Sequence, residues 1–178
     1  MEWKPVLYLV ASGASPARDL ASAVAELRTG WDVCVITTAE GARFLDTAGL
    51  AELTGHPVRT SFKDPDAPDV LPPADVFAAA PATFNTINKW AAGISDTLAL
   101  GLLNEAVGLG KPIVAVPWPN VALARHPAFG RSIETLRGCG ISVILDLDRL
   151  PDDANPHPVT FPWAELMAEL ERIRDRLG

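Results

Sequence analysis

The stretch DVFAAAPATFNTINK, residues 75–89, decides how this chain is expected to fold. Residues 75–80 are almost wholly apolar, which is typical of a strand covered on both faces of a parallel sheet. Pro81 ends the apolar run, and Thr83 is a helix-capping residue type that stands directly before a helical pattern. A buried strand that re-enters as a helix brings unpaired backbone N–H groups to one point. The stretch therefore predicts an α/β unit with a polar turn at the strand end.

The turn has two interpretations. Unpaired donors at a helix start bind an anion or the polar edge of a ring. Ala82 and Thr83 are small enough to let a ligand approach the backbone, and the Asn85 amide both donates and accepts hydrogen bonds. An ordinary strand-to-helix turn capped by Thr83 explains the same residues, and such caps are common. Taken alone, the stretch favours the ordinary turn.

The rest of the chain repeats the strand–helix pattern. Apolar runs predict strands at 6–11, 32–37, 113–116 and 141–145, with a short third strand after residues 54–59. One helix is expected between Ser15 and about residue 28, and another is expected to begin at Thr38. Further helices are expected at 97–109, 128–137 and 163–177, whereas Leu50–Leu53 is expected to form a turn. This alternation predicts one doubly wound α/β layer and a single domain over residues 1–178.

Ligands of such sheets bind beyond the carboxyl ends of the strands. Four loops are expected there: Gly13–Ser15, Thr38, Pro81–Asn85 and Pro117–Asn120. They carry small, uncharged or amide-bearing residues, which suits a flat polar ring with a phosphate tail.

The first loop has the layout of a phosphate cradle, with Ser15 as the expected helix N-cap and Pro16 at the first helical position. Only one glycine, Gly13, is present, so the dinucleotide fingerprint is absent. Thr37 and Thr38 stand where an acidic residue would hold a ribose, which argues against NAD.

Composition excludes several classes of function. The chain has 178 residues, 48% of them hydrophobic, and a net charge of −7, so we expect a globular protein without non-specific nucleic-acid binding. Cys34 and Cys139 form no metal or redox spacing, and Cys34 is expected to be a small core residue. Neither a signal peptide nor a membrane-spanning run is present, which predicts a soluble cytoplasmic protein.

Several motifs resemble one family of enzymes. PATFNT, residues 81–86, resembles the proline–alanine–serine–alanine–asparagine–threonine motif of the homo-oligomeric flavin-containing cysteine decarboxylases, and INKWAAGISDTL at 87–98 continues the similarity with the same spacing. PWPN at 117–120 resembles the family's proline–x–methionine–asparagine loop. HPA at 126–128 stands where an asparagine–proline pair is usual. The similarity extends from about Val6 to Leu145.

The resemblance implies a flavodoxin-like (Rossmann-type) fold, FMN as cofactor, and a trimer or dodecamer with flavin between subunits. It implies a small-molecule or peptide thiol substrate that is oxidised at a cysteine thiolate and then loses CO2, with the cofactor as electron acceptor. Asn120 is expected to bind the substrate carboxylate. The residues expected to contact the cofactor are Gly13 and Ser15 at the phosphate, and Thr38, Phe44, Pro81, Ala82, Thr83 and Asn85 around the flavin.

One departure from the family affects the chemistry. The family's base is a histidine just upstream of the central strand, and residues 67–73 here contain none. Loss of a general base costs roughly 10²–10⁴-fold in rate. Asp69 is a poor substitute, since an ordinary carboxyl with a pKa of about 3.9 is a weak base for a thiol. His126 shares a loop with Asn120 and is the candidate acid or base, whereas His56 and His157 are expected at the surface.

Three hypotheses follow. The first is an FMN-binding flavoprotein that lacks the usual catalytic histidine. The second is an active decarboxylase or oxidoreductase on a cysteine-like thiol that uses His126 and Asn120. The third is a pseudoenzyme subunit that contributes its Asn120 half of a site to a hetero-oligomer. Trp118 is expected to close the pocket over the flavin or to pack between subunits, and Asp96 to cap a helix or anchor the site.

Overall fold

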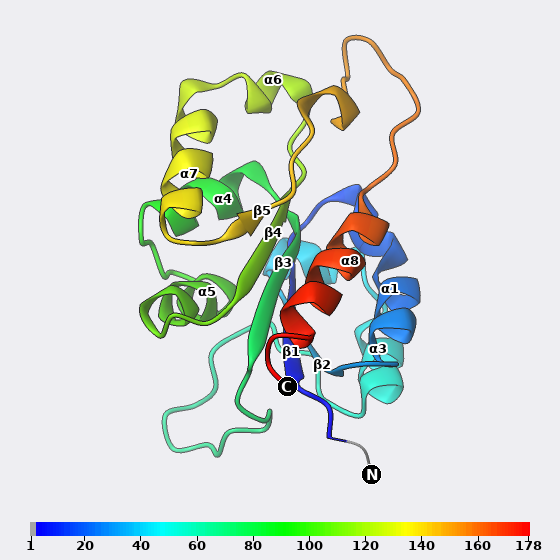
Figure 1. Cartoon of the computed structure of the whole chain (residues 1–178), viewed down its shortest axis with the longest axis vertical. Coiled ribbons are helices and arrows are strands. Elements are labelled where there is room, and N and C mark those ends of the chain that lie inside the picture. The colour runs from blue at the N-terminus through cyan, green and yellow to red at the C-terminus, as the bar shows by residue number, and fades with distance from the viewer. Residues whose placement is uncertain (1–2) are drawn as a thin grey trace.

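The protein folds around a five-stranded sheet, as seen in a computed structural model that describes residues 3–178 (Figure 1). All neighbouring strands are parallel, and their order is β2-β1-β3-β4-β5. The strands are β1 (Val6–Ala11), β2 (Asp32–Thr37), β3 (Val76–Ala82), β4 (Ile113–Pro117) and β5 (Ser142–Val143). The predicted doubly wound, flavodoxin-like α/β fold is therefore confirmed.

Helices cover both faces of the sheet (Figure 1). One face carries α1 (Leu20–Leu27), α3 (Thr47–Thr54) and α8 (Trp163–Arg174), and the other carries α4 (Phe84–Ala91), α5 (Leu98–Gly108) and α7 (Pro127–Gly138). The short elements are η1 (Ser15–Asp19), α2 (Ala39–Ala42), α6 (Val121–Ala124) and η2 (Leu147–Arg149).

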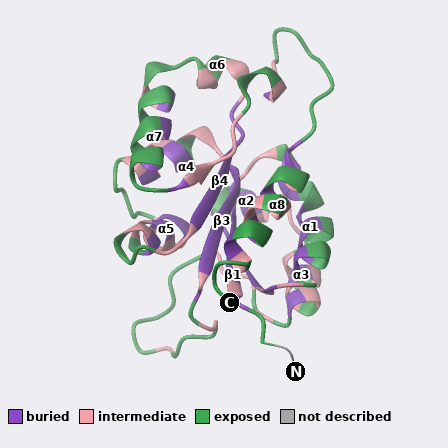
Figure 2. Ribbon diagram, viewed as in Figure 1, coloured by how far each residue is buried: buried purple, intermediate pink, exposed green. Residues whose placement is uncertain are grey.

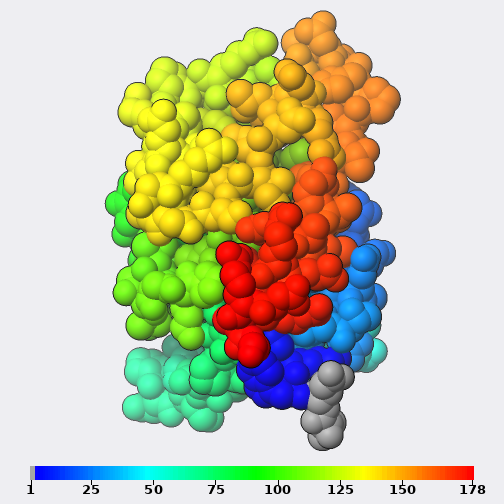
Figure 3. Space-filling view, in the orientation of Figure 1, coloured from blue at the N-terminus to red at the C-terminus, as the bar shows by residue number. Residues whose placement is uncertain are grey.

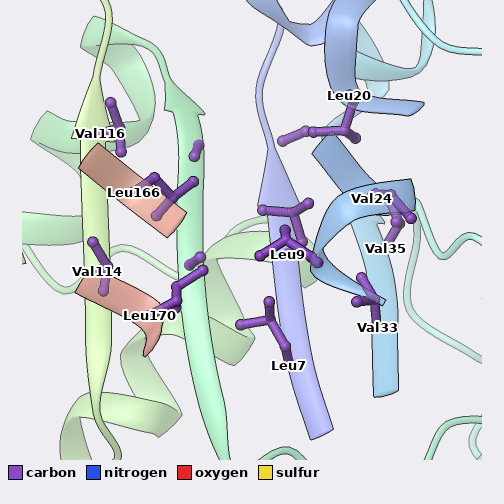
Figure 4. Packing of buried hydrophobic residues seen from close by; sticks show 14 of the residues in the cluster. Leu7, Leu9, Leu20, Val24, Val33, Val35, Val114, Val116, Leu166 and Leu170 are labelled. Atoms are coloured by element: carbon purple, nitrogen blue, oxygen red, sulfur yellow. The ribbon is translucent and has the colours of Figure 1, made fainter. Parts of the chain in front are cut away.

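Two apolar cores sandwich the sheet, because successive strand residues point to opposite faces. On β1, Leu7 and Leu9 pack toward α1 and α8, whereas Val10 packs toward α4 and α5. Leu166 and Leu170 of α8 are fully buried over the central strands (Figure 4). Figure 2 shows the central strands buried along their length. The strand ends are therefore fixed in space, and the loops that leave them start from defined positions.

Three predicted elements differ from the structure. Leu50–Leu53 lies in helix α3 instead of a turn, because Asp46 caps that helix and the Leu50 side chain is buried in the core. The expected third strand is a single bridge between Ile36 and Arg59, so residues 54–59 add no strand. The last strand is shorter than predicted: β5 pairs with β4 over two residues only, at one side of the sheet.

Two predicted helix caps are also wrong. Ala14, not Ser15, occupies the cap position of η1, and no side chain caps that turn. Thr97 caps α5 by accepting a hydrogen bond from the Leu100 N–H at 3.2 Å. Asp96 instead forms an ion pair with Lys89 at 2.6 Å. Within residues 3–178, no helix is both long and apolar enough to cross a bilayer.

Candidate functional site

The predicted loops meet at the carboxyl edge of the sheet. The strand register places Ala11 beside Thr37 and Ala82 beside Pro117, so β1 and β2, and likewise β3 and β4, end at the same level. Three backbone hydrogen bonds join the loops: Thr38 N–H to the Ala11 carbonyl (3.1 Å), Ser12 N–H to the Pro81 carbonyl (2.9 Å) and Trp118 N–H to the Ala82 carbonyl (2.8 Å). The loops after four strands thus form one continuous surface.

A buried cluster of hydroxyl groups supports the turn at residues 81–86. Thr83 caps α4, and its Oγ1 accepts a hydrogen bond from the Thr86 N–H at 3.3 Å and donates one to Thr86 Oγ1 at 3.1 Å. Ser12 Oγ lies 2.8 Å from Thr86 Oγ1, and both side chains are buried. The N–H groups of Phe84 and Asn85, at the first positions of the helix, have no carbonyl of their own helix to bind. The turn therefore presents backbone donors on a fixed support.

Glycines let the first two loops approach each other. A Cβ atom on Gly13 would lie 2.8 Å from Glu40 Cβ, and one on Gly41 would lie 2.6 Å from the Ala11 carbonyl oxygen. Real Cβ atoms do not come this close to backbone atoms, so α2 packs against the β1 loop only because Gly41 has no side chain. Sequence reasoning missed Gly41. The available signal was a glycine in the first turn of a helix, where glycine is disfavoured.

The remaining predicted cofactor residues surround this surface. Thr38 caps α2 by accepting a hydrogen bond from Gly41 N–H at 3.0 Å, and Pro81 and Ala82 are buried in β3. Asn85 and Ser15 are exposed at the edge. Phe44 is half-buried, and the Arg18 guanidinium carbon lies 5.1 Å from the centre of its ring, within cation–π range. Their contact with a cofactor stays a prediction.

Asn120 and His126 lie on the next loop, at the two ends of α6. Asn120 caps α6, with its Oδ1 accepting from Leu123 N–H at 2.9 Å, and its Nδ2 donates to Asp153 Oδ2 at 3.0 Å. His126 caps α7, with its Nδ1 accepting from Ala128 N–H at 3.1 Å. The His126 ring meets the Phe84 ring edge-on, with 5.8 Å between centres. His126 therefore adjoins the turn at residues 81–86, and Asn120 lies at the other end of α6.

The caps define the chemistry of His126. Since Nδ1 accepts a backbone hydrogen bond, it carries the ring's lone pair, and the proton of the neutral imidazole is placed on Nε2. A base needs a free lone pair, and the one on Nδ1 is engaged. In this geometry His126 is a donor through Nε2 and acts as a base only after releasing the α7 cap.

The other two histidines lie apart from this chemistry, and the Trp118 side chain packs into the core. His56 Nε2 lies 2.7 Å from Asp32 Oδ1, at the start of β2 and so at the opposite edge of the sheet; the ring is half-buried, not a free surface histidine. His157 is exposed in the segment before α8. Trp118 is 7% exposed and packs edge-on against Phe161, with 5.1 Å between ring centres. Trp118 thus packs in the core of this chain, and its expected place over the flavin or between subunits stays a prediction.

A cysteine thiol and a tyrosine hydroxyl are buried away from the site. Burial raises the pKa of the Cys34 thiol to about 12, with a smaller contribution from Asp32. Burial likewise raises the pKa of Tyr8 to about 12, and its hydroxyl donates to the Pro72 carbonyl at 2.8 Å. Cys34 is fully buried in the core, as predicted, and stays a thiol at neutral pH.

Comparison with known proteins gives the family. The Flavoprotein family matches residues 1–175. The "Coenzyme A biosynthesis bifunctional protein CoaBC" of Bacillus subtilis (strain 168) is 31% identical over 137 residues, which is 74% of this chain and 33% of that protein. A "Cysteine/Cysteine sulfinic acid decarboxylase" from an unknown prokaryotic organism is 35% identical over 101 residues, or 53% of this chain and 27% of that protein. The chain thus spans about a third of the length of these curated relatives or less.

Solved structures share the fold. A PPC decarboxylase mutant complexed with pantothenoylaminoethenethiol aligns with a TM-score of 0.76 at 21% identity, covering 97% of this chain and 100% of that chain. The FMN-dependent cysteine decarboxylase SpaF aligns with a TM-score of 0.73 at 23% identity, covering 94% and 96%. The family and these neighbours support the FMN expected from the sequence. With its five-stranded parallel sheet and the family match over nearly its whole length, the chain belongs to the Flavoprotein family.

Proposed function

We propose that this protein binds FMN at the carboxyl edge of its sheet. The observation that carries this proposal is the joined set of loops: the Gly13 loop is hydrogen-bonded to the β3 turn and packed on α2 without space for a Cβ at Gly41. Small residues and backbone donors suit a ring and a phosphate that are approached closely. Membership of the Flavoprotein family supports the same cofactor.

Each part of the surface is assigned a role. Gly13 and Ser15 hold the phosphate, because their loop is the phosphate-cradle position of such sheets. Thr38, Pro81, Ala82, Thr83 and Asn85 surround the polar edges of the flavin, and Phe44 packs near the ring. When bound, FMN supplies the electron acceptor for oxidation of a ligand; the chain supplies placement and exclusion of water.

The ligand in this proposal is a thiol that carries a carboxylate. The relatives include a cysteine decarboxylase and FMN-dependent cysteine decarboxylases, and these names suit a thiol ligand. Within this chain the support is Asn120, whose amide N–H₂ points outward and already binds a carboxylate, that of Asp153. An amide donor next to the flavin site would orient the carboxylate of a cysteine-like ligand.

The chemistry after binding is proposed to be slow. Residues 67–73 carry no histidine, and His126 has its lone pair engaged in the α7 cap. Without a base, thiol deprotonation is expected to be roughly 10²–10⁴-fold slower. The favoured function is therefore an FMN-binding flavoprotein with weak or no decarboxylase activity of its own, and an active lyase or oxidoreductase that uses His126 is the alternative.

The outer face of α5 supports the proposed homo-oligomer. A cavity of about 850 Å³ lies between α5 and residues 59–74, lined by apolar residues of α5 such as Leu98 and Leu102. Beside it Phe62 is 59% exposed and Leu109 65% exposed. Large apolar side chains exposed together mark an interaction surface. Its partner is proposed to be a second copy of the chain, and the choice between trimer and dodecamer stays a prediction, as does a cytoplasmic location.

The cofactor proposal is tested by titration. FMN added to the purified protein should lose fluorescence and saturate at one equivalent per chain, and the isolated complex should be yellow. Gly13→Val, whose Cβ would lie 2.8 Å from Glu40 Cβ and force the first two loops apart, should abolish uptake. Gly108→Ala, with open space around its Cα, should leave uptake unchanged. A colourless protein that takes up no FMN would refute the proposal.

The activity is tested on the loaded protein. A peptide ending in cysteine is incubated aerobically, and loss of CO2 together with two hydrogens is followed by mass spectrometry. Slow or absent turnover is expected. Turnover that is abolished in both Asn120→Ala and His126→Ala would instead support the active enzyme.

A further inference from the structure

The Asn120 side chain is bound at both of its ends. Oδ1 accepts the Leu123 N–H at 2.9 Å as the cap of α6, and Nδ2 donates to Asp153 Oδ2 at 3.0 Å. The cap fixes the orientation of the amide, because only the oxygen can accept a backbone N–H. Nδ2 must then face away from α6. Toward the site, Asn120 is consequently a pure donor, which selects an acceptor such as a carboxylate.

The carboxylate that Asn120 binds belongs to a loop, residues 151–160, which we call the strap. The strap is anchored at both ends. At its start the Pro151 carbonyl accepts the Val121 N–H at 2.9 Å, directly beside Asn120. Just beyond its end, Phe161 is buried against Trp118. Between these anchors, residues 153–160 are exposed, and the strap stands out at one corner of the molecule (Figures 1 and 3).

A local turn directs Asp153 toward the site. Asp152 Oδ1 accepts the Ala154 N–H at 2.9 Å, which bends the chain around Asp153. The hydrogen bonds to Ala154 and Asn155 also hold the pKa of the Asp152 carboxyl below its ordinary value. The contact between Asp153 and Asn120 joins residues 33 positions apart and ties the exposed part of the strap to the site.

We infer that Asp153 is a built-in competitor for the ligand carboxylate, so that the strap determines which ligands the Asn120 site accepts. The inference rests on the proposed function, in which Asn120 binds the carboxylate of a thiol ligand. A ligand carboxylate that reaches Nδ2 must displace Asp153 or lie beside it, and two carboxylates on one donor repel each other. An uncharged ligand of the same shape meets no such repulsion. Asp153 therefore lowers the preference of the site for acids.

The test compares two probes and needs no turnover. One is a short peptide that ends in cysteine with a free carboxyl group, and the other is the same peptide as its carboxamide. Binding of each is measured by isothermal calorimetry on the protein as purified and after FMN loading. Asp153→Ala should tighten acid binding by about tenfold, the effect of one charge-assisted hydrogen bond, and amide binding by clearly less, because the amide gains the free donor but had no charge repulsion to lose. Asp175→Asn, which removes an exposed carboxylate on the last helix turn, should keep the wild-type ratio.

A second variant isolates the Asn120 amide. Asn120→Ser retains an oxygen that can cap α6 but has no N–H₂ group. In the Asn120→Ser background, Asp153→Ala should no longer change the acid-to-amide ratio. The inference is overturned if Asp153→Ala tightens both probes equally, if its effect survives Asn120→Ser, or if neither probe binds any variant. Flavin uptake is scored separately, so loss of FMN binding counts against the proposed function and an unchanged probe ratio against the strap.

Discussion

The turn at residues 81–86 and the loop from Asn120 to His126 face the same edge of the sheet but are held in different ways. The turn rests on the buried hydroxyls of Ser12 and Thr86, which are 1% and 6% exposed. Asn120 and His126 are held by side-chain caps on short, solvent-facing segments. Buried hydrogen bonds are costly to break, whereas exposed ones exchange readily with water. We therefore expect the turn to keep its shape when a ligand binds, and the Asn120 loop to be the part that exchanges hydrogen-bond partners.

We expect the largest effect on the fixed side of the site from a substitution at Gly41. Gly41→Ala places a Cβ 2.6 Å from the Ala11 carbonyl oxygen, so the first two loops must separate. We expect a loss of about 1–3 kcal/mol in the free energy of unfolding, measured in urea, together with loss of FMN uptake. Gly130→Ala, in helix α7 with open space around it, is the control and should be neutral or stabilising by up to about 1 kcal/mol. Equal stability of the two variants would show that the loops do not need this close approach.

The hydroxyl cluster gives the next largest effect. Thr86→Val keeps the shape of the side chain but leaves Ser12 Oγ buried without its partner, at a cost of about 1–3 kcal/mol in unfolding free energy. Adding Ser12→Ala should cost less than the sum of the two single changes, since both remove the same bond. Thr135→Val, whose hydroxyl is exposed on α7, should change stability by less than about 0.5 kcal/mol. If the two losses in unfolding free energy simply add in the double variant, the Ser12–Thr86 hydrogen bond does not contribute to stability.

The Asn120 loop should respond more weakly and in a way that depends on capping. His126→Ala removes the α7 cap and should cost about 1 kcal/mol, whereas His126→Asn supplies another cap acceptor and should cost less. Urea unfolding of both variants checks this order. If His126→Asn also retains any thiol oxidation that the wild type shows, the imidazole is no part of the mechanism. If that variant loses the oxidation at full stability, the imidazole belongs to the chemistry.

The smallest effect concerns the ion pair that flanks the strap. The hydrogen bond from Arg149, at 2.6 Å, holds the pKa of Glu165 below its ordinary value. Because the folded state lowers this pKa, the contribution is present above the ordinary glutamate range and is lost as the pH falls below it. Glu165→Gln should therefore lower the free energy of unfolding slightly at pH 7 and by less in acid, which flattens the acid limb of a stability-against-pH curve. A change in acid as large as the change at pH 7 would contradict the assignment.

Much of the fold was predictable because its signals are local. The apolar runs at 6–11, 32–37, 75–80 and 113–116 each form a strand of the sheet. Elements with weak local signals were predicted less well. Leu50–Leu53 looked like a turn, and its helix depends on the Asp46 cap and on burial of Leu50. The expected third strand is a single bridge in the structure, in which Arg59 pairs with Ile36 of β2.

The candidate site was predicted in part. The loops at the strand ends were found because parallel strands end at one edge, and the family supports the cofactor. Gly41 escaped notice, since its role depends on the Ala11 carbonyl in another segment. The engaged lone pair of His126 was equally invisible, because a sequence shows that a histidine precedes a helix but not which nitrogen caps it.

The sequence by itself determined the parallel sheet, the order of its loops, the family and the absence of a histidine at residues 67–73, because periodicity and motifs are written in consecutive residues. Only the tertiary structure decided that Ser12 meets Thr86 across 74 positions and that Asp153 occupies the amide of Asn120 across 33. Such contacts depend on how separate segments are packed against one another. That packing follows from burial of the whole core, and no single stretch of the chain records it.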